Sequence, residues 1–180
     1  MAMLKLDERY RYDHYTDLRD GPGMQVLVHE VAPGDKFLIG EARVVVRRTD
    51  HRPITPTIGF RIEAEGKSVV LAGDTVPCAE LDDLCRGADI YVQTVLRPDL
   101  VELVKQFVPA LTSRTNDILD YHSSVEDAAK TAACAGVKTL MLTHFVPAMQ
   151  SSQEADWLVL ATPHFSGNMV LGPDLTNAEV

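Results

Sequence analysis

The sequence predicts an α/β protein in which helices pack on a mixed β-sheet. Three observations lead to this prediction. The stretch from about residue 24 to residue 72 repeats apolar-polar alternation and turn residues, as expected of consecutive strands. After residue 78, segments with helical spacing alternate with short apolar runs of strand length. The predicted order of elements is β-β-β-α-β-α-α-β, which places helices between the later strands of a layered sheet.

The front of the chain is predicted to be β-structure. Apolar and polar residues alternate in "MQVLVHEV" (24–31), and Pro33-Gly34-Asp35 predicts a turn after it. Strands are expected in "MQVLVHEV", in "KFLIGEARVVVRRTDH", at residues 58–63 and at residues 68–72. The last of these strands brings the chain to Gly73-Asp74-Thr75.

The back of the chain mixes helices with strands. "CAELDDLCRGA" has helical spacing and ends at Gly87, and "DIYVQTVL" returns to a buried strand. Residues 97–121 are predicted to form an amphipathic helix followed by a polar loop. Ser123, with Glu126 three residues later, predicts a capping box for an alanine-rich helix that Gly136 ends. The run "VKTLML" then predicts another buried strand.

Length and composition limit the function classes. The 180 residues suffice for one domain with a core, so we expect an irregular lead-in over residues 1–23 and one domain over residues 24–180. The net charge of −9, without a basic run, argues against a broad nucleic-acid-binding surface. No apolar stretch reaches membrane-spanning length, and the three cysteines form no Cys-x-x-Cys pair. We therefore expect a cytoplasmic protein with reduced thiols.

Three polar residues follow predicted strands, where the ligands of layered α/β proteins gather. His51 follows "ARVVVRRTD", Asp74 follows "SVVLAG" and His144 follows "TLMLT". His122 lies directly before a predicted helix N-terminus, which favours an anion. Two imidazoles and one carboxylate suit a borderline divalent ion such as zinc, and a carboxylate can bridge two metals. The indicated chemistry is metal-dependent hydrolysis.

Each candidate also has a purely structural interpretation. Asp74 could be a turn residue that bonds its own backbone, and His144 could be a core histidine bonded to a carbonyl. His122 could belong to the helix cap, and His51 to a plain loop. The ordered set of four residues favours the functional interpretation over these single-residue alternatives.

This ordered set resembles a known family. "TDHRPITPTIGFRIEAEGKSVVLAGDT" and "DYHSSVEDAAKTAACAGVKTLMLTHFVP" are similar to the second half of a metallo-β-lactamase-fold hydrolase of the ribonuclease Z and phosphodiesterase branch. The resemblance implies a layered αββα-type fold. It also implies that His51 binds one metal, that Asp74 bridges two metals and that His144 binds the other.

The resemblance further implies a reaction. The divalent metal would be zinc, or else manganese or iron, and it would activate a water that attacks a phosphodiester. His122 would contact the scissile phosphate or protonate the leaving group, so that Asp74 and His122 are the implied catalytic residues. The implied substrate is an RNA or a small phosphodiester.

One family motif does not occur in this sequence, the His-x-His-x-Asp-His stretch that supplies most ligands of the first metal. Residues 24–180 thus resemble an incomplete, C-terminal part of the domain, in a fragment, a truncated gene product or a diverged protein. His51, Asp74 and His144 alone would not complete a metal site, so activity requires further ligands from elsewhere. Half of the sheet sandwich would leave an apolar face, which we expect a homo-oligomer or a partner chain to cover.

Two alternatives to phosphodiester hydrolysis stay open at this point. One is a non-catalytic or truncated half domain that has lost its metal and acts through oligomerisation or a partner chain. The other is a lactone or thioester hydrolase. The position of His122 before a helix favours a phosphate oxygen over a neutral carbonyl.

Overall fold

The computed structural model describes residues 9–10, 13, 28–108, 110 and 112–180. Residues Val31–Val180 form one compact unit, and residues Met1–Glu30 form a separate unit. The predicted lead-in over residues 1–23 lies outside the described residues, except for residues 9, 10 and 13. No helix among the described residues is long and apolar enough to cross a membrane.

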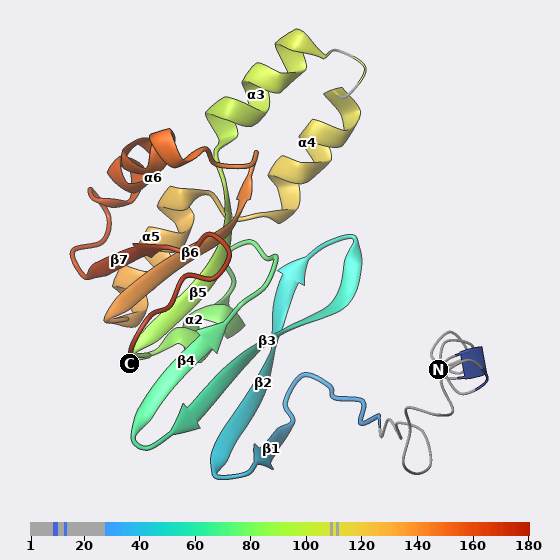
Figure 1. Cartoon of the computed structure of the whole chain (residues 1–180), viewed down its shortest axis with the longest axis vertical. Helices are drawn as coiled ribbons and strands as arrows, with labels where there is room; N and C mark the ends of the chain where they lie inside the picture. Colours follow the sequence, from blue (N-terminus) through green and yellow to red (C-terminus); the bar gives the residue numbers. More distant parts are fainter. Residues whose placement is uncertain (1–8, 11–12, 14–27, 109, 111) are drawn as a thin grey trace. The chain divides into compact units, whose positions relative to one another are not determined.

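Seven strands form one mixed sheet whose spatial order equals the sequence order (Figure 1). Strands β1 to β4 pair antiparallel, whereas β4 to β7 pair parallel, because helices connect the later strands. The strands are β1 (Lys36–Ile39), β2 (Ala42–His51), β3 (Ile54–Ala64), β4 (Lys67–Leu71), β5 (Ile90–Leu96), β6 (Thr139–Val146) and β7 (Asn168–Leu171). The predicted α/β class is confirmed.

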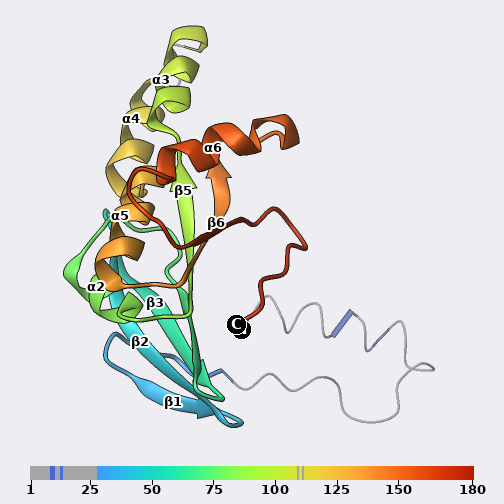
Figure 2. The same cartoon turned by 90° about the vertical axis from the view of Figure 1, so that its left-hand side faces the viewer.

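The helices connect and cover the parallel part of the sheet. They are α2 (Ala79–Cys85), α3 (Pro98–Phe107), α4 (Thr112–Tyr121), α5 (Val125–Ala135) and α6 (Glu154–Ala161). Figure 2 shows α2 and α5 on the same side of the sheet. The core lies between these elements: Leu84 of α2, Tyr91 of β5, Leu140 of β6 and Trp157 of α6 are each at most 2% exposed. Each such buried side chain contributes on the order of 2 kcal/mol of hydrophobic free energy.

The opposite face of the sheet is also apolar. Successive side chains of a strand point to opposite faces of the sheet. Val70 of β4 is fully buried against the helices, so the next residue, Leu71, belongs to the other face. Paired residues of neighbouring strands share a face. Leu71 is 40% exposed. The register continues through it as one row across six strands: Val46, Phe60, Leu71, Val92, Met141 and Val170. We call these six residues the apolar row.

Two predictions for the front of the chain are wrong. Residues 28–31 of "MQVLVHEV" carry no strand, and residues 24–27 lie outside the described part of the chain. A turn at residues 32–35, closed by hydrogen bonds between Ala32 and Asp35, precedes the first strand of the sheet. The stretch predicted as one strand after this turn is a hairpin, because Gly40 and Glu41 form a turn between β1 and β2.

Three predictions for the back of the chain need correction. Residues 112–121 form helix α4 rather than a polar loop; the helix has few apolar positions, and its packing against α3 stabilises it. The N-cap of α5 is Ser124, with Asp127 completing the capping box, because the Ser123 hydroxyl instead donates to the Thr75 carbonyl. Helix α6 and strand β7 have no counterpart among the predicted elements.

Candidate functional site

The structure brings all four candidate residues together at one end of the sheet. His51 is the last residue of β2, Asp74 follows β4, His144 lies in β6, and His122 lies between α4 and α5. The Asp74 carboxylate contacts two of the histidines, with 3.1 Å between Oδ1 and His144 Nδ1 and 3.6 Å between Oδ2 and His122 Nε2. The ring centroids of His51 and His122 are 5.2 Å apart. Residues up to 93 positions apart in sequence thus form one cluster, in which His122 and His144 contact the Asp74 carboxylate and His51 packs against His122.

The last turn of α4 orients two of these imidazoles. The Tyr121 carbonyl lies 2.9 Å from His51 Nδ1, and the Ile118 carbonyl lies 3.1 Å from His122 Nδ1. A carbonyl only accepts hydrogen bonds, so both Nδ1 atoms donate, and Nε2 is the nitrogen that each ring has left for another partner. The Tyr121 ring packs against both imidazoles, at centroid distances of 4.7 Å and 4.9 Å. Backbone carbonyls of this kind commonly orient metal-binding histidines.

The Gly73 carbonyl is fixed by strand β5. It accepts hydrogen bonds from Gln93 Nε2 at 3.1 Å and from the Thr94 hydroxyl at 2.9 Å. Gly73 has a φ of +69°, which a residue with a Cβ rarely adopts, so glycine permits this backbone conformation directly before Asp74. Gln93 is fully buried and accepts a hydrogen bond from Tyr91, so the core itself holds the chain where it reaches Asp74.

Thr75 joins Asp74 to two further parts of the fold. Its hydroxyl accepts a hydrogen bond from the Asp50 N–H at 2.9 Å, which connects it to the end of β2. Its carbonyl accepts one from the Ser123 hydroxyl at 2.7 Å, next to His122. Thr75 is fully buried, so these bonds are shielded from water. The loop around Asp74 is therefore held from the His51 side and from the His122 side.

His144 lies at an irregularity of β6. Between the pairs Thr94–Thr143 and Leu96–Val146, β6 has one residue more than β5, which defines a bulge. His144 has a φ of +46°, a left-handed conformation that costs on the order of 1 kcal/mol for a residue with a Cβ. The bulge re-aims the imidazole toward Asp74, and such strained residues are concentrated at functional sites.

Contacts within the cluster shift the pKa values of Asp74 and His122. The His122 ring lowers the pKa of the Asp74 carboxyl far below its usual range, against the increase that partial burial causes, and Thr94 and His144 add to the decrease. Burial lowers the pKa of His122, but Asp74 and the Ile118 carbonyl raise it by more, so the net shift is upward. Asp74 is therefore an anion at neutral pH, and His122 holds a proton more readily than a free histidine.

The donor types fit a divalent metal such as zinc, which takes imidazole nitrogens and carboxylate oxygens. The 3.1 Å between Asp74 Oδ1 and His144 Nδ1 is close to the separation of two ligand atoms on one zinc ion, about 3.3 Å for tetrahedral geometry. The described residues nevertheless contain no group of three or more His, Cys, Asp or Glu side chains placed to hold a metal ion. The cluster thus supplies part of a ligand set.

Two hollows adjoin His51 on either side of the β2–β3 connection. One, of about 310 Å³, lies toward the start of α2, and the other, of about 450 Å³, lies toward α4. His51, Arg52 and Ile54 line both hollows. A molecule longer than one phosphate group could therefore extend from His51 into either hollow.

Several residues of this site were not singled out as candidates from the sequence: Gln93, Thr94, Thr75, Ser123 and Tyr121. The only sequence signal for Gln93 and Thr94 is the interruption of the apolar run "YVQTVL" by two polar residues. Tyr121 and Ser123 flank His122 in sequence, but their contacts with His51 and Thr75 depend on the folded chain.

Comparisons with known proteins agree with this geometry. Residues 4–145 match the family model described as "Beta-lactamase superfamily domain". The chain is 50% identical over 174 residues to "Ribonuclease Z" of Mycobacterium tuberculosis H37Rv, covering 97% of this chain and 61% of the relative. It is 49% identical over 178 residues to "Ribonuclease Z" of Mycolicibacterium paratuberculosis, covering 98% of this chain and 60% of the relative. The chain thus spans about three fifths of these relatives.

Solved structures show the same fold at lower identity. The metallo-β-lactamase fold protein YhfI from Bacillus subtilis matches with a TM-score of 0.59 at 19% identity, over 79% of this chain and 50% of that one. Zn²⁺-bound PqqB from Methylobacterium extorquens matches with a TM-score of 0.58 at 14% identity, over 83% of this chain and 55% of that one. The chain belongs to the metallo-β-lactamase superfamily, and within it to the ribonuclease Z-like proteins.

Proposed function

We propose that this protein is a metal-dependent hydrolase that cleaves phosphodiester bonds. The observation that carries the proposal is the cluster in which His122 and His144 contact the Asp74 carboxylate and His51 packs against His122. Relatives with about half of their aligned residues identical carry the name ribonuclease Z, which supports an RNA or a related small phosphodiester as the substrate. A cytoplasmic location remains a prediction.

In this proposal His51, Asp74 and His144 hold the metal, which we propose to be zinc. His51 offers Nε2, because its Nδ1–H donates to the Tyr121 carbonyl. Asp74 offers two carboxylate oxygens, of which Oδ1 lies next to His144 and Oδ2 lies next to His122. When bound, the metal supplies an activated water and a positive charge for the phosphate oxygens.

His122 is the proposed proton donor or phosphate contact. Its Nε2 faces the Asp74 carboxylate, and its Nδ1–H is occupied by the Ile118 carbonyl, so only Nε2 is available for a substrate. The upward pKa shift favours the protonated ring, which could donate to the leaving oxygen. His122 directly follows α4, whose Ile118 carbonyl it bonds, and lies three residues before the first residue of α5.

We further propose that residues 24–180 are the C-terminal part of a metallo-β-lactamase-like domain, and that a second copy of the chain covers the apolar row. The described residues supply only part of a metal ligand set, and the chain spans about three fifths of the named relatives. Leu71 of the apolar row is 40% exposed and four other members are half-buried, whereas Val46 is already buried; accessible apolar sheet faces drive association. Light scattering at micromolar concentration should therefore show a dimer, whereas a stable monomer would contradict the second proposal.

Metal analysis tests the proposed function. The protein is purified without chelator, and zinc, manganese and iron per chain are measured for the wild type and for Asp74→Ala. We expect about one or two equivalents in the wild type and a loss of most of them in the variant. Asp174→Ala, which makes the same change at an exposed carboxylate after β7, is the matched control and should retain the metal. Equal metal content in the two variants, or none in the wild type, would contradict the proposal.

A further inference from the structure

The larger hollow beside His51 has the size and the position of a ligand site. Its volume of about 450 Å³ lies within the range of about 300–1,000 Å³ that small-molecule sites occupy. His51 lines it, so a ligand in this hollow would contact one of the proposed metal ligands. The other lining residues come from the turn between β2 and β3 and from one face of α4.

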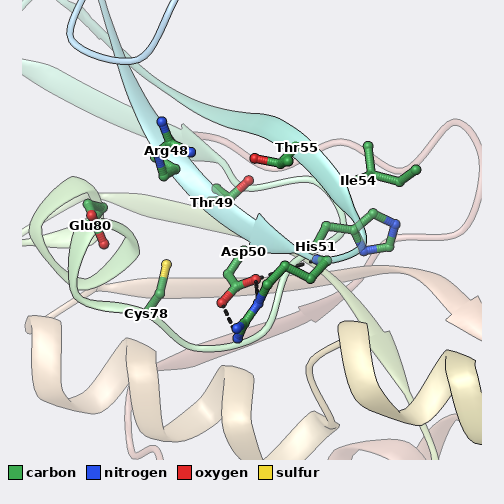
Figure 3. Close-up of a pocket in the computed structure, with 9 residues that line it drawn as sticks. Arg48, Thr49, Asp50, His51, Ile54, Thr55, Cys78 and Glu80 are labelled. Atoms are coloured by element: carbon green, nitrogen blue, oxygen red, sulfur yellow. Dashed lines mark hydrogen bonds and ion pairs between the residues drawn. The ribbon is translucent and has the colours of Figure 1, made fainter.

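Apolar side chains form part of the lining. Ile54 pairs with His51 across the tight turn between β2 and β3, so their side chains share a face of the hairpin (Figure 3). Pro53 and Tyr121 also line the hollow, and the Tyr121 ring packs against His51 at a centroid distance of 4.7 Å. These residues offer an apolar surface to a flat aromatic ligand.

Asp117 and Asp120 bring two unpaired carboxylates to the hollow. They are three residues apart on α4 and therefore lie on one face of the helix, together with Tyr121. Neither carboxylate makes an ion pair or a hydrogen bond with any residue in the described part of the chain, whereas the Asp50 carboxylate pairs with Arg52. Both carboxylates are exposed, so a ligand in the hollow can reach them.

The local structure of α4 gives no reason for these carboxylates. Asp120 lies in the last turn of the helix, where the macrodipole disfavours a negative charge, and that turn contains no basic residue. Two like charges three residues apart on a helix also repel each other. Local rules of this kind are broken mainly at functional sites, so a ligand in the hollow explains the two carboxylates better than helix stability does.

The charge of the hollow favours hydrogen-bond donors over a phosphate. Arg52 lines it too, but its Nε and Nη2 donate to the Asp50 carboxylate at 2.9 Å and 2.8 Å. Because that cation is paired, the two free carboxylates leave the hollow negative, and they would repel a phosphate. The described residues contain no group of three or more His, Cys, Asp or Glu side chains placed to hold a metal ion. The N–H groups of a nucleobase, in contrast, can donate to both carboxylates.

We propose that the larger hollow binds the nucleobase attached to the cleaved phosphate, and that Asp117 and Asp120 determine which base is accepted. The inference rests on the proposed phosphodiesterase function and adds a specificity site to it. Guanine fits best, because its N1–H and N2–H lie on one edge and can both donate to one carboxylate. Adenine and cytosine offer one amino group on that edge, and the N–H of uracil lies between two carbonyl oxygens that a carboxylate repels. The expected preference is therefore guanine first and uracil last.

Binding measurements test this specificity without requiring catalysis. The probes are guanosine 3′,5′-bisphosphate and uridine 3′,5′-bisphosphate, titrated calorimetrically at fixed ionic strength. Each probe carries a phosphate on either side of the nucleoside, so either phosphate can lie at the cluster while the base reaches the hollow. We expect the wild type to bind the guanosine probe about tenfold more tightly than the uridine probe. Equal affinities, or no binding of either probe, would refute the proposal.

The double variant Asp117→Asn/Asp120→Asn should remove the guanine preference, because an amide has only one acceptor oxygen. It should keep or raise the thermal stability, because it removes charges that α4 disfavours. Carboxylates with a structural role would lower the stability when replaced and leave the ratio of the two affinities unchanged. Asp82→Asn/Asp156→Asn makes the same changes at exposed carboxylates of α2 and α6 outside the hollow, and this control should keep the preference. The specificity site is refuted if the two double variants behave alike.

Ile54 gives an independent test of the apolar lining. Ile54→Ala should weaken the binding of both probes about threefold without changing their ratio, because it removes apolar surface that either base would contact. Val159→Ala, at a position of α6 that is 59% exposed, compared with 60% for Ile54, is the control and should change neither affinity. If Ile54→Ala also changes neither affinity, the base does not lie in this hollow.

A cationic amine is the other ligand that two free carboxylates would accept, and spermidine is the probe for it. The base site is refuted if the two nucleotides bind equally while spermidine binds in a way that Asp117→Asn/Asp120→Asn removes. That result would assign the hollow to a cation.

The two proposals can fail separately. Asp74→Ala should weaken the binding of both nucleotide probes, because it changes the site of the cleaved phosphate, and it should leave the ratio of the two affinities intact. If Asp74→Ala leaves both affinities and the metal content unchanged while Asp117→Asn/Asp120→Asn still removes the guanine preference, the proposed function fails and the base site stands. If the metal depends on Asp74 but the wild type shows no preference, the base site fails and the proposed function stands.

Discussion

Replacing Gln93 by leucine should disturb both the core and the chain at Asp74. Gln93 is fully buried in β5, accepts a hydrogen bond of 2.6 Å from the Tyr91 hydroxyl and donates to the Gly73 carbonyl. Leucine has a similar volume, so the change removes hydrogen bonds without opening a large cavity. The Tyr91 hydroxyl, which is also fully buried, would lose its acceptor.

The expected destabilisation is about 2 kcal/mol. Leaving the Tyr91 hydroxyl unpaired costs about 1–3 kcal/mol. Gly73 keeps the hydrogen bond from Thr94 and is exposed to water, so its carbonyl contributes less. Removing both partners of the buried bond should cost less than the sum of the single changes, so the double variant Tyr91→Phe/Gln93→Leu should show a coupling of about 1 kcal/mol.

Urea unfolding of the wild type, the two single variants and the double variant measures these free energies. For a domain of this size, 2 kcal/mol corresponds to a decrease of about 6 °C in the melting temperature. Additive single changes, or a loss below about 0.5 kcal/mol for Gln93→Leu, would refute the assignment of the buried Tyr91–Gln93 bond. Gln106→Leu, at an exposed position of α3, is a control that should change stability little.

Two further predictions concern charge and association. Lys138 lowers the pKa of Asp89 to about 2, so Asp89 stabilises the fold above its ordinary pKa of about 4, and this stability is lost as the pH falls toward 2. Urea unfolding at pH 6 and pH 3 measures this effect. Between these two pH values the free energy of unfolding should decrease by about 1 kcal/mol because of Asp89, after allowance for screening at the exposed lysine, and the total decrease should be smaller in Asp89→Asn. Equal decreases in the wild type and in Asp89→Asn would contradict this prediction. Leu71→Lys should convert the proposed dimer to a monomer, whereas Leu175→Lys, at a position 97% exposed, should not; light scattering that shows a dimer for both variants would rule out the apolar row as the interface.

The sequence predicted the strands and helices that carry the site, with errors where periodicity is weak. The strands around His51, Asp74 and His144 follow from apolar runs that stop at polar residues. Helix α4 could not be predicted in this way, because it has few apolar positions and is stabilised by contact with α3. The α5 cap was misplaced by one residue, because the bond from Ser123 to Thr75 crosses 48 residues of sequence.

The sequence by itself determined the α/β class, the family and the four candidate residues, because each of these follows from short apolar segments and short sequence motifs. Only the tertiary structure decided how those residues are oriented. The Tyr121 carbonyl that orients His51 is 70 residues away, and the side chains that fix Gly73 belong to the next strand. Hydrogen bonds and burial join residues that are distant in sequence, and no periodicity in the sequence encodes such pairs.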